Sequence, residues 1–335
     1  MTSESLSKPW RRTPLIHSAI LSKHAGCQVH LKLENLQPSG CFKSRGVGNF
    51  ILQHTISLSN PADREKLHFY ISSGGNAGLG CASAAASLGV PVSIVVPTTT
   101  SQYMIEKLNA AGASDVIQVG ASWMEADAHL KDVVIPAAKE RGEIPTYVPP
   151  FDAQEIWDGN ATIVEEVLED LGGAPDAVVC SVGGGGLFSG IMQGLIRAGA
   201  NTVTKVLAVE TEGAASLALS LKEGRIATLP AITSIANALG TRSVARQTFE
   251  YAQLENVKSV VLTDRDAMEG CVRFADDERI MVEAACGVNL ALCYGGRLKK
   301  VLPELTKESK VVIVVCGGSN ITAEMLQSYA QELGQ

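Results

Sequence analysis

The chain has 335 residues, of which 46% are hydrophobic, 19% charged and 5% aromatic, a balance typical of globular enzymes. Its formal net charge is −7 and no run of lysine or arginine is long enough to follow a phosphate backbone, so nucleic-acid binding has little support. No apolar run reaches the length of a membrane span and the N-terminal residues lack the apolar core of a signal peptide, so we expect a cytoplasmic protein without membrane contact.

Apolar, β-branched runs alternate along the chain with longer segments of helical periodicity, which predicts a parallel α/β architecture with buried strands. The expected strands are His68–Ile71, Pro91–Val96, Val116–Val119, Ala177–Val182, Val206–Val209, Val260–Leu262 and Val311–Val315. The clearest expected helices are Gly78–Leu88, Gln102–Ala111 and Ala161–Leu171, each followed by a glycine suited to a left-handed C-cap.

The sharpest interruption of this alternation is Pro145–Pro150, where two adjacent prolines exclude a helix. No repeat or low-complexity tract divides the chain elsewhere. We therefore predict a large domain made of residues 1–45 and 149–335, with a small domain of residues 46–148 inserted into it.

Lys43 lies in the turn-forming stretch Pro38–Gly46, directly after Phe42. A lysine in such a place is usually a solvated surface charge. Beside an aromatic ring, however, the ammonium loses part of its hydration, which lowers its pKa and yields an amine that attacks aldehydes.

Three further glycine-rich segments each follow an expected strand: Ser72–Gly78, Ser181–Leu187 and Val315–Asn320. The first two also open a helix, so their backbone N–H groups are suited to hold a carboxylate or a phosphate. Four successive glycines in the second allow close approach of a ligand, and neither a Walker ending nor a dinucleotide fingerprint is present. Because ligands bind outside the carboxyl ends of parallel strands, we expect these segments to line one crevice.

The segments PSGCFKSRG, SSGGNAG, SVGGGGL and VCGGSN, in this order and spacing, resemble the pyridoxal-phosphate (PLP) dependent serine/threonine dehydratases of the tryptophan synthase β family, called fold type II. The similarity extends over nearly the whole chain. It implies an α/β fold of two domains, each with a mostly parallel twisted sheet flanked by helices.

The resemblance also implies a role for each site residue. Lys43 would carry PLP as a Schiff base and act as the catalytic base. The cofactor would further be bound by Phe42, Asn76, Gly183, Gly184, Gly185, Gly186, Ala238 and Cys316. The substrate carboxylate would be bound by Ser73, Gly74, Gly75, Asn76 and Ala77.

Cys316 would face the pyridine nitrogen of the cofactor. A neutral thiol does not hold that nitrogen protonated as an aspartate would, so the ring withdraws electrons less strongly and favours elimination. Racemases of this fold usually place serine there, so Cys316 favours a dehydratase of the mammalian-liver type.

A monovalent cation, with K⁺ as the expected ion, would be bound by Gly183, Glu210, Ala214, Leu239 and Thr241. Glu210 ends an expected buried strand, where an unpaired carboxylate is costly. A salt bridge or the N-terminus of a helix is the alternative partner for this carboxylate.

Two positions depart from the family pattern. Gly74 stands where relatives often have alanine, which we expect to enlarge the substrate pocket slightly and to loosen the carboxylate-binding segment. Ala284 stands where proline is common, which we interpret as a small backbone change.

The sequence gives little support to a hydrolase or to a metal site built from acidic residues or cysteines. The six histidines all lie within the first 129 residues and outside the glycine-rich segments, and no GxSxG motif exists, so a Ser/His/Asp hydrolase is not expected. The acidic run Asp276–Glu278 is interpreted as a solvated helix face rather than a metal site. The eight cysteines show no zinc-binding spacing and are expected to be reduced thiols, several of them in apolar strands or helices where cysteine acts as a small hydrophobic side chain.

We therefore expect an L-serine dehydratase that forms pyruvate and ammonia and also converts L-threonine to 2-oxobutyrate, acting as a homodimer in amino-acid catabolism and gluconeogenesis. The alternatives are a serine racemase or a β-replacement synthase of the same fold, and a non-catalytic carrier of PLP or phosphate. Because the chain ends soon after VCGGSN, feedback by isoleucine through an added domain is not expected.

Overall fold

The computed structural model describes residues 6–334, which divide into two compact units. Unit 1 is the described part of Met1–Arg11 together with Gln37–Gly159. Unit 2 is Arg12–Leu36 together with the described part of Asn160–Gln335. The small domain predicted over residues 46–148 falls within unit 1, and its boundaries stay a prediction.

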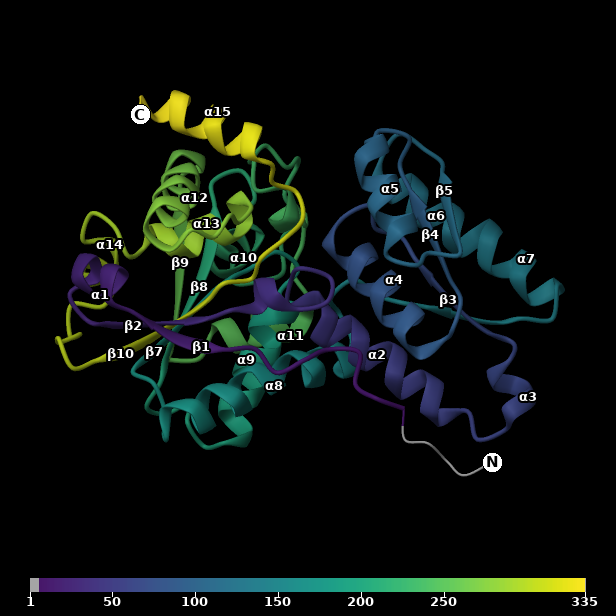
Figure 1. Cartoon of the computed structure of the whole chain (residues 1–335), viewed down its shortest axis with the longest axis horizontal. Coiled ribbons are helices and arrows are strands. Elements are labelled where there is room, and N and C mark those ends of the chain that lie inside the picture. The colour runs from purple at the N-terminus through teal and green to yellow at the C-terminus, as the bar shows by residue number, and fades with distance from the viewer. Residues whose placement is uncertain (1–5, 335) are drawn as a thin grey trace. The chain divides into compact units, whose positions relative to one another are not determined.

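Unit 1 is built on a four-stranded sheet in the order β5-β4-β3-β6, in which every neighbouring pair is parallel (Figure 1). Its strands are β3 (Leu67–Ile71), β4 (Val92–Val96), β5 (Asp115–Gln118) and β6 (Ile144–Tyr147). Its helices are α2 (Lys43–Ser57), α3 (Pro61–Arg64), α4 (Asn76–Leu88), α5 (Gln102–Ala110), α6 (Trp123–His129), the π-helical turn η2 (Leu130–Val134) and α7 (Ile135–Glu140).

Both faces of this sheet are covered, because successive strand residues point to opposite sides. Phe69 and Ile94 belong to a larger apolar cluster with side chains of α2, α4 and α5. Tyr70 and Val95 belong to a smaller cluster with side chains of α6, η2 and α7. Unit 1 is therefore a three-layer α/β/α structure.

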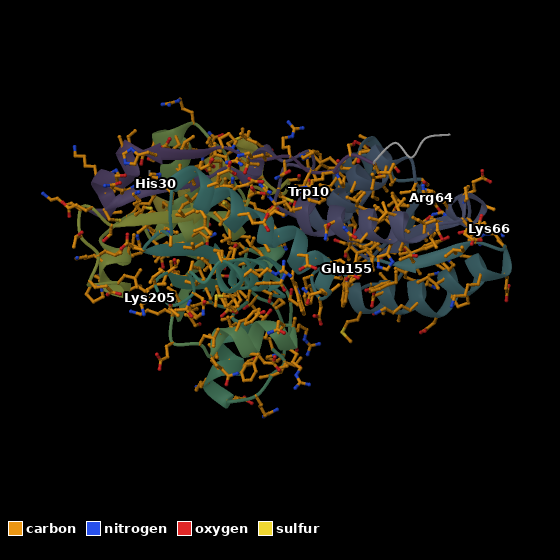
Figure 2. The ribbon with its side chains drawn as sticks, turned by 90° about the horizontal axis from the view of Figure 1, so that it is seen from below. Trp10, His30, Arg64, Lys66, Glu155 and Lys205 are labelled. Carbon is orange, nitrogen blue, oxygen red and sulfur yellow. The ribbon has the colours of Figure 1, made fainter. Side chains whose placement is uncertain are left out.

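Unit 2 is built on a six-stranded sheet in the order β1-β2-β10-β7-β8-β9, parallel except for the β1–β2 pair. Its strands are β1 (Leu15–Ser18), β2 (Gln28–Lys32), β7 (Ala177–Ser181), β8 (Lys205–Thr211), β9 (Val257–Leu262) and β10 (Lys310–Val314). Its helices are α1 (Ala19–Ala25), η1 (Glu34–Leu36), α8 (Gln154–Leu171, which begins in unit 1), α9 (Gly186–Arg197), α10 (Ser216–Glu223), η3 (Asn237–Leu239), α11 (Arg246–Ala252), α12 (Asp264–Glu278), α13 (Ala284–Ala291), α14 (Arg297–Val301) and α15 (Ala323–Leu333). Side chains fill the space between the sheet and helices of each unit (Figure 2).

The predicted parallel α/β class and all seven predicted strands are confirmed. The expectation that every one of these strands is buried on both faces is wrong for β5 and β9. These two strands lie at sheet edges and keep exposed residues, whereas β4 and β7 are buried throughout. Pro145–Pro150, predicted only as a boundary, contributes to the edge strand β6, where Pro145 pairs with His68. An edge position tolerates a proline because one side of the strand needs no donor.

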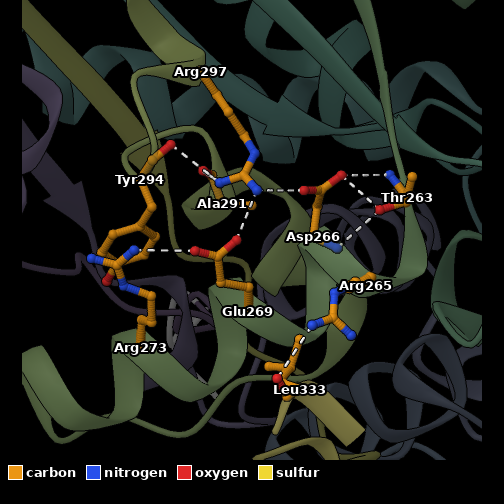
Figure 3. A network of polar contacts seen from close by, with 9 residues as sticks. All are labelled: Thr263, Arg265, Asp266, Glu269, Arg273, Ala291, Tyr294, Arg297 and Leu333. Carbon is orange, nitrogen blue, oxygen red and sulfur yellow. Dashed lines mark hydrogen bonds and ion pairs between the residues drawn. The ribbon is translucent and has the colours of Figure 1, made fainter. Parts of the chain in front are cut away.

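Ion pairs hold α12 to the first residue of α14 (Figure 3). The Arg297 guanidinium binds Asp266 at 2.5 Å and Glu269 at 2.7 Å, and it also donates to the carbonyl oxygen of Tyr294. Arg273 lies 3.9 Å from the centroid of the Tyr294 ring and pairs with Glu269. This network fixes the turn that leads from α13 into α14.

The acidic run at the end of α12 makes hydrogen bonds to neighbouring side chains. Asp276–Glu278 is helical as expected, but Asp277 accepts a hydrogen bond from Tyr294 and Glu278 accepts one from Ser18. All eight cysteines, which lie in both units, are free, as predicted, and all are buried. None of the helices within residues 6–334 combines the length and apolar character that a membrane span requires.

Candidate active site

Lys43 is the first residue of α2 rather than part of a loop, and Phe42 occupies the N-cap position. Its Nζ lies 5.4 Å from the centroid of the Phe42 ring and donates a hydrogen bond to the carbonyl oxygen of Pro150. Loss of hydration lowers the pKa of Lys43 to about 8. The sequence predicted that this pKa is lowered, without giving a value. A Cβ at Gly80 would lie 3.1 Å from Lys43 Cβ, so α4 packs directly against the lysine.

The segment Ser72–Asn76 connects β3 to α4 at the carboxyl end of the unit 1 sheet, as predicted. Asn76 is the first residue of α4, and Gly75 is its N-cap. The first amides of a helix lack intrahelical acceptors and carry its positive dipole end, so this 13-residue helix presents N–H groups to an anion. Ser73 Oγ accepts a hydrogen bond of 3.4 Å from the Gly75 N–H group.

Gly74 departs from the family pattern, and the structure shows what a methyl group would meet there. A Cβ at Gly74 would lie 2.9 Å from Thr100 Cγ2 and 3.0 Å from Thr100 Oγ1. The side chain of Thr100 therefore takes the space that an alanine methyl group would need. Ala284, the other departure, is the first residue of α13, a position where proline is also well accommodated.

The four-glycine segment Gly183–Gly186 connects β7 to α9 in unit 2, again at the carboxyl end of a strand. Gly185 is the N-cap of α9 with φ 97°, a left-handed conformation, and its Cβ position is filled by Thr248. A Cβ at Gly183 would lie 3.1 Å from Leu239 Cα. These glycines give a narrow backbone turn in front of a 12-residue helix, as anion binding requires.

Cys316 follows β10 in the same unit and is 6% exposed. Its Sγ lies 3.3 Å from Ser181 Oγ and accepts a hydrogen bond from Asn289 at 3.5 Å. A hydrogen bond from Cys286 lowers the pKa of Cys316, whereas burial raises the pKa of Cys286 well above its usual value. Cys316 is thus oriented by three neighbouring polar groups.

Glu210 is fully buried near the end of β8, as predicted. Its two carboxylate oxygens accept N–H bonds from Leu217 at 2.7 Å and Ala218 at 2.8 Å in the first turn of α10. This is the helix N-terminal partner that the sequence left open as an alternative to cation binding. Burial nevertheless raises the pKa of Glu210 to about 7, so these two bonds do not fully offset its desolvation.

The other expected cation ligands also belong to unit 2. Ala214 is buried three residues after β8, and Leu239 ends the short helix η3 that contains Ala238. The Thr241 N–H group donates to the Leu239 carbonyl oxygen at 2.6 Å. No group of three or more His, Cys, Asp or Glu side chains suited to a metal occurs among the described residues, so a cation here would depend on carbonyl oxygens.

Unit 1 contains one arrangement that the sequence did not reveal. Ser93 Oγ lies 3.0 Å from His68 Nε2, and His68 Nδ1 lies 3.1 Å from Glu143 Oε2, which is the serine–histidine–acid order of hydrolases. Ser93, however, lies within β4, is 6% exposed and pairs with Tyr70 across the sheet. We assign this chain of hydrogen bonds a structural role because its hydroxyl faces a neighbouring strand rather than a strand end.

Comparison with known proteins identifies the family. The family model described as pyridoxal-phosphate dependent enzyme matches residues 6–317. This chain belongs to that family. Its two mostly parallel sheets flanked by helices are the fold type II architecture expected from the sequence.

Three similar proteins are named for one type of reaction. "Serine dehydratase-like" from Rattus norvegicus is 42% identical over 98% of this chain and 96% of that protein. "Catabolic L-serine/threonine dehydratase" from Saccharomyces cerevisiae is 40% identical over 96% of this chain and 91% of that protein. The crystal structure of a fungal L-serine ammonia-lyase from Rhizomucor miehei has a TM-score of 0.88 and 32% identity, covering 98% of this chain and 100% of that one.

The residues present fit PLP. Lys43 is an amine with a pKa lowered to about 8, which suits attack on the cofactor aldehyde. The Gly183–Gly186 turn before α9 suits its phosphate, and the buried Cys316 thiol suits a neutral pyridine nitrogen. That these groups act on one bound cofactor stays a prediction.

Proposed function

We propose that this protein is an L-serine dehydratase that converts L-serine to pyruvate and ammonia, and L-threonine to 2-oxobutyrate and ammonia. The observation that carries the proposal is the identity of 40–42% with proteins named for these reactions over at least 96% of the chain. The partly desolvated amine of Lys43 supports it independently, because PLP-dependent elimination uses an amine to hold the cofactor and a base to remove the Cα proton.

Lys43 has two tasks in this proposal. Its Nζ would hold the cofactor covalently, and the same amine, when free, would remove the Cα proton of the substrate. When bound, PLP withdraws electrons from the substrate Cα and makes that proton acidic. With a pKa of about 8, roughly a tenth of the amine is uncharged at pH 7, far more than for an ordinary lysine. Proton removal by Lys43 is therefore feasible near neutral pH.

The other residues bind and orient. Ser73, Gly74, Gly75, Asn76 and Ala77 would hold the substrate carboxylate at the N-terminus of α4. Gly183–Gly186 would hold the cofactor phosphate, and Phe42 and Ala238 would contact its ring. Cys316, oriented by Ser181, would leave the pyridine nitrogen unprotonated, which favours loss of the β-hydroxyl over reprotonation at Cα. The enamine that results from loss of water hydrolyses to the keto acid and ammonia.

We also propose a K⁺ site formed by Glu210 and the carbonyl oxygens of Gly183, Ala214, Leu239 and Thr241. Two observations support it. Glu210 is fully buried with a raised pKa, so a cation would compensate its charge. A Cβ at Gly183 would also lie 3.1 Å from Leu239 Cα, so two of the proposed carbonyl ligands belong to closely packed backbone segments.

In the cell we expect a cytoplasmic homodimer that serves amino-acid catabolism and gluconeogenesis.

The test is a keto-acid assay on the purified holoenzyme with L-serine and with L-threonine, in K⁺ and in a K⁺-free buffer. We expect keto acid and ammonia in equal amounts, with more activity in K⁺. Lys43→Arg keeps a positive charge but should lose at least about 1,000-fold in kcat, since a guanidinium is not a base at this pH. Lys66→Ala removes an exposed lysine of the same unit and serves as the control (Figure 2).

The products separate this proposal from its alternatives. D-Serine as the main product would identify a racemase, and sulfide-dependent formation of cysteine would identify a synthase. Absence of turnover with both hydroxy amino acids, despite bound PLP, would indicate a carrier. Each of these three results would refute the dehydratase assignment.

A further inference from the structure

Trp123 links two loops at the carboxyl end of the unit 1 sheet. It is the first residue of α6 and follows β5, whereas Ser72 follows β3. In the sheet order β5-β4-β3-β6, one strand separates these two. The indole Nε1–H group of Trp123 nevertheless donates a hydrogen bond of 2.7 Å to the Ser72 carbonyl oxygen. The side chain thus reaches past the end of β4.

This bond acts on the peptide that leads into the carboxylate-binding segment. The Ser72 carbonyl and the Ser73 N–H group belong to one planar trans peptide, so they point in opposite directions. Fixing the carbonyl toward Trp123 therefore fixes the direction of the Ser73 N–H group. The next turn is equally constrained, since a Cβ at Gly78 would lie 2.1 Å from the Ser73 carbonyl oxygen.

We propose that Trp123 is a positioning residue, whose indole N–H group orients the Ser72–Ser73 peptide so that the Ser73 N–H group is directed at the substrate carboxylate. The inference rests on the proposed function for the identity of the ligand. It adds a residue outside the glycine-rich segments, 50 positions along the chain from Ser73.

Packing alone does not account for Trp123. The residue is 46% exposed and is not among the side chains of the two apolar clusters of unit 1. A half-exposed indole leaves about half of its apolar surface in solvent, whereas its hydrogen bond to a backbone carbonyl constrains the main chain directly. The indole N–H group, rather than the apolar surface of the ring, therefore makes the contact that constrains the structure.

The loop that carries Trp123 is itself held firmly. The Gly120 carbonyl oxygen accepts bonds from the Thr98 N–H group at 2.8 Å and from Thr98 Oγ1 at 2.9 Å. Glu125 accepts a bond from the Ala121 N–H group at 2.9 Å, and Ser122 caps α6. The loop with the indole donor is therefore tied to the segment that follows β4 and to its own helix, which lets the indole act as a fixed support for Ser72.

Trp123→Phe is the informative variant, because it retains an aromatic ring and removes the N–H group. Two ligands are titrated into the holoenzyme by the change in cofactor absorbance: glycine, which has an amine and a carboxylate, and ethanolamine, which has no carboxylate. We expect the Kd of glycine to rise about tenfold while that of ethanolamine stays unchanged. The KM for L-serine should rise likewise, with kcat changed less than about twofold.

A second measurement is independent of activity. In the cofactor-free protein, hydrogen exchange of the peptide covering residues 72–79 should be faster in Trp123→Phe than in the parent protein. The matched control is Trp10→Phe, which changes a half-buried tryptophan packed on the larger apolar cluster of the same unit. This variant should change neither the Kd of glycine or ethanolamine nor the rate of hydrogen exchange in the peptide covering residues 72–79.

An equal loss of affinity for glycine and ethanolamine, or unchanged affinity for both, would overturn the positioning role. The proposed function fails separately. If the parent protein binds glycine but forms no keto acid from L-serine, the dehydratase assignment is lost, whereas a selective loss of glycine affinity in Trp123→Phe still supports the role of Trp123.

Discussion

The chemistry at Lys43 depends on an amine that is uncharged at a lower pH than an ordinary lysine. Burial lowers its pKa from 10.5 to about 8, so the reactive free amine predominates above that pH. We expect the rate at which cofactor-free protein takes up PLP to rise with pH and to level off above about pH 8. Absorbance of the bound cofactor follows the reaction, and a rate that keeps rising through pH 10 would contradict the shifted pKa.

Glu210 makes the proposed cation site dependent on pH. Its pKa is raised to about 7, so a proton competes with K⁺ below that pH, and the carboxylate is free to bind a cation above it. We expect apparent K⁺ affinity to increase about tenfold between pH 6 and pH 8, measured as the KCl-dependent rise in Tm. Glu210→Gln should abolish the KCl effect, whereas Glu212→Gln, at an exposed neighbouring position, should retain it. Equal KCl effects at both pH values would argue against this site.

Gly185 shows how strictly the proposed phosphate turn requires glycine. An alanine methyl group there would lie 1.9 Å from Thr248 Oγ1, in a backbone with φ 97°. Steric overlap and left-handed strain together should cost about 3 kcal/mol in free energy of unfolding. Gly173→Ala, where the added methyl group meets nothing within 4 Å, is the control. Urea denaturation measures the free energy of unfolding of both variants. Similar losses in Gly185→Ala and Gly173→Ala would mean that the turn rearranges to accommodate the methyl group.

At the level of elements, Arg297 joins α12 to the chain after α13 through two carboxylates (Figure 3). Arg297→Met should lower the free energy of unfolding by about 2 kcal/mol, because the carboxylates of Asp266 and Glu269 lose the partly buried cation that both of them bind. Arg246→Met breaks a pair in which the two side chains are 85% and 47% exposed and should have little effect. If urea denaturation gives equal losses in free energy of unfolding for the two variants, the ion pairs of Arg297 do not stabilise the packing of α12 against the chain after α13.

The sequence predicted the interior elements better than the edges. Strands such as Val92–Val96 are continuous apolar runs, so their pattern is unambiguous. The strands it missed, β1, β2 and β6, are short, partly exposed or contain polar residues and proline, and their pairing depends on distant partners. Lys43 looked like a loop residue for a similar reason, because the Pro38–Gly46 composition conceals the start of α2.

For the molecule as a whole, motif order predicted the family, the cofactor and the segments at the strand ends. It did not predict which residues support those segments. Trp123 lies in a stretch without a motif, and its bond to Ser72 arises only when β5, β4 and β3 align. Such supporting contacts follow from tertiary structure and leave no local pattern in the chain.

In the proposed mechanism, a single lysine carries the cofactor. Borohydride reduction of the holoenzyme, followed by proteolysis and mass spectrometry, measures this directly. We predict one reduced PLP adduct, on the peptide containing Lys43, and none in Lys43→Arg. An adduct on another lysine of active enzyme, or full activity without any adduct, would exclude this role of Lys43.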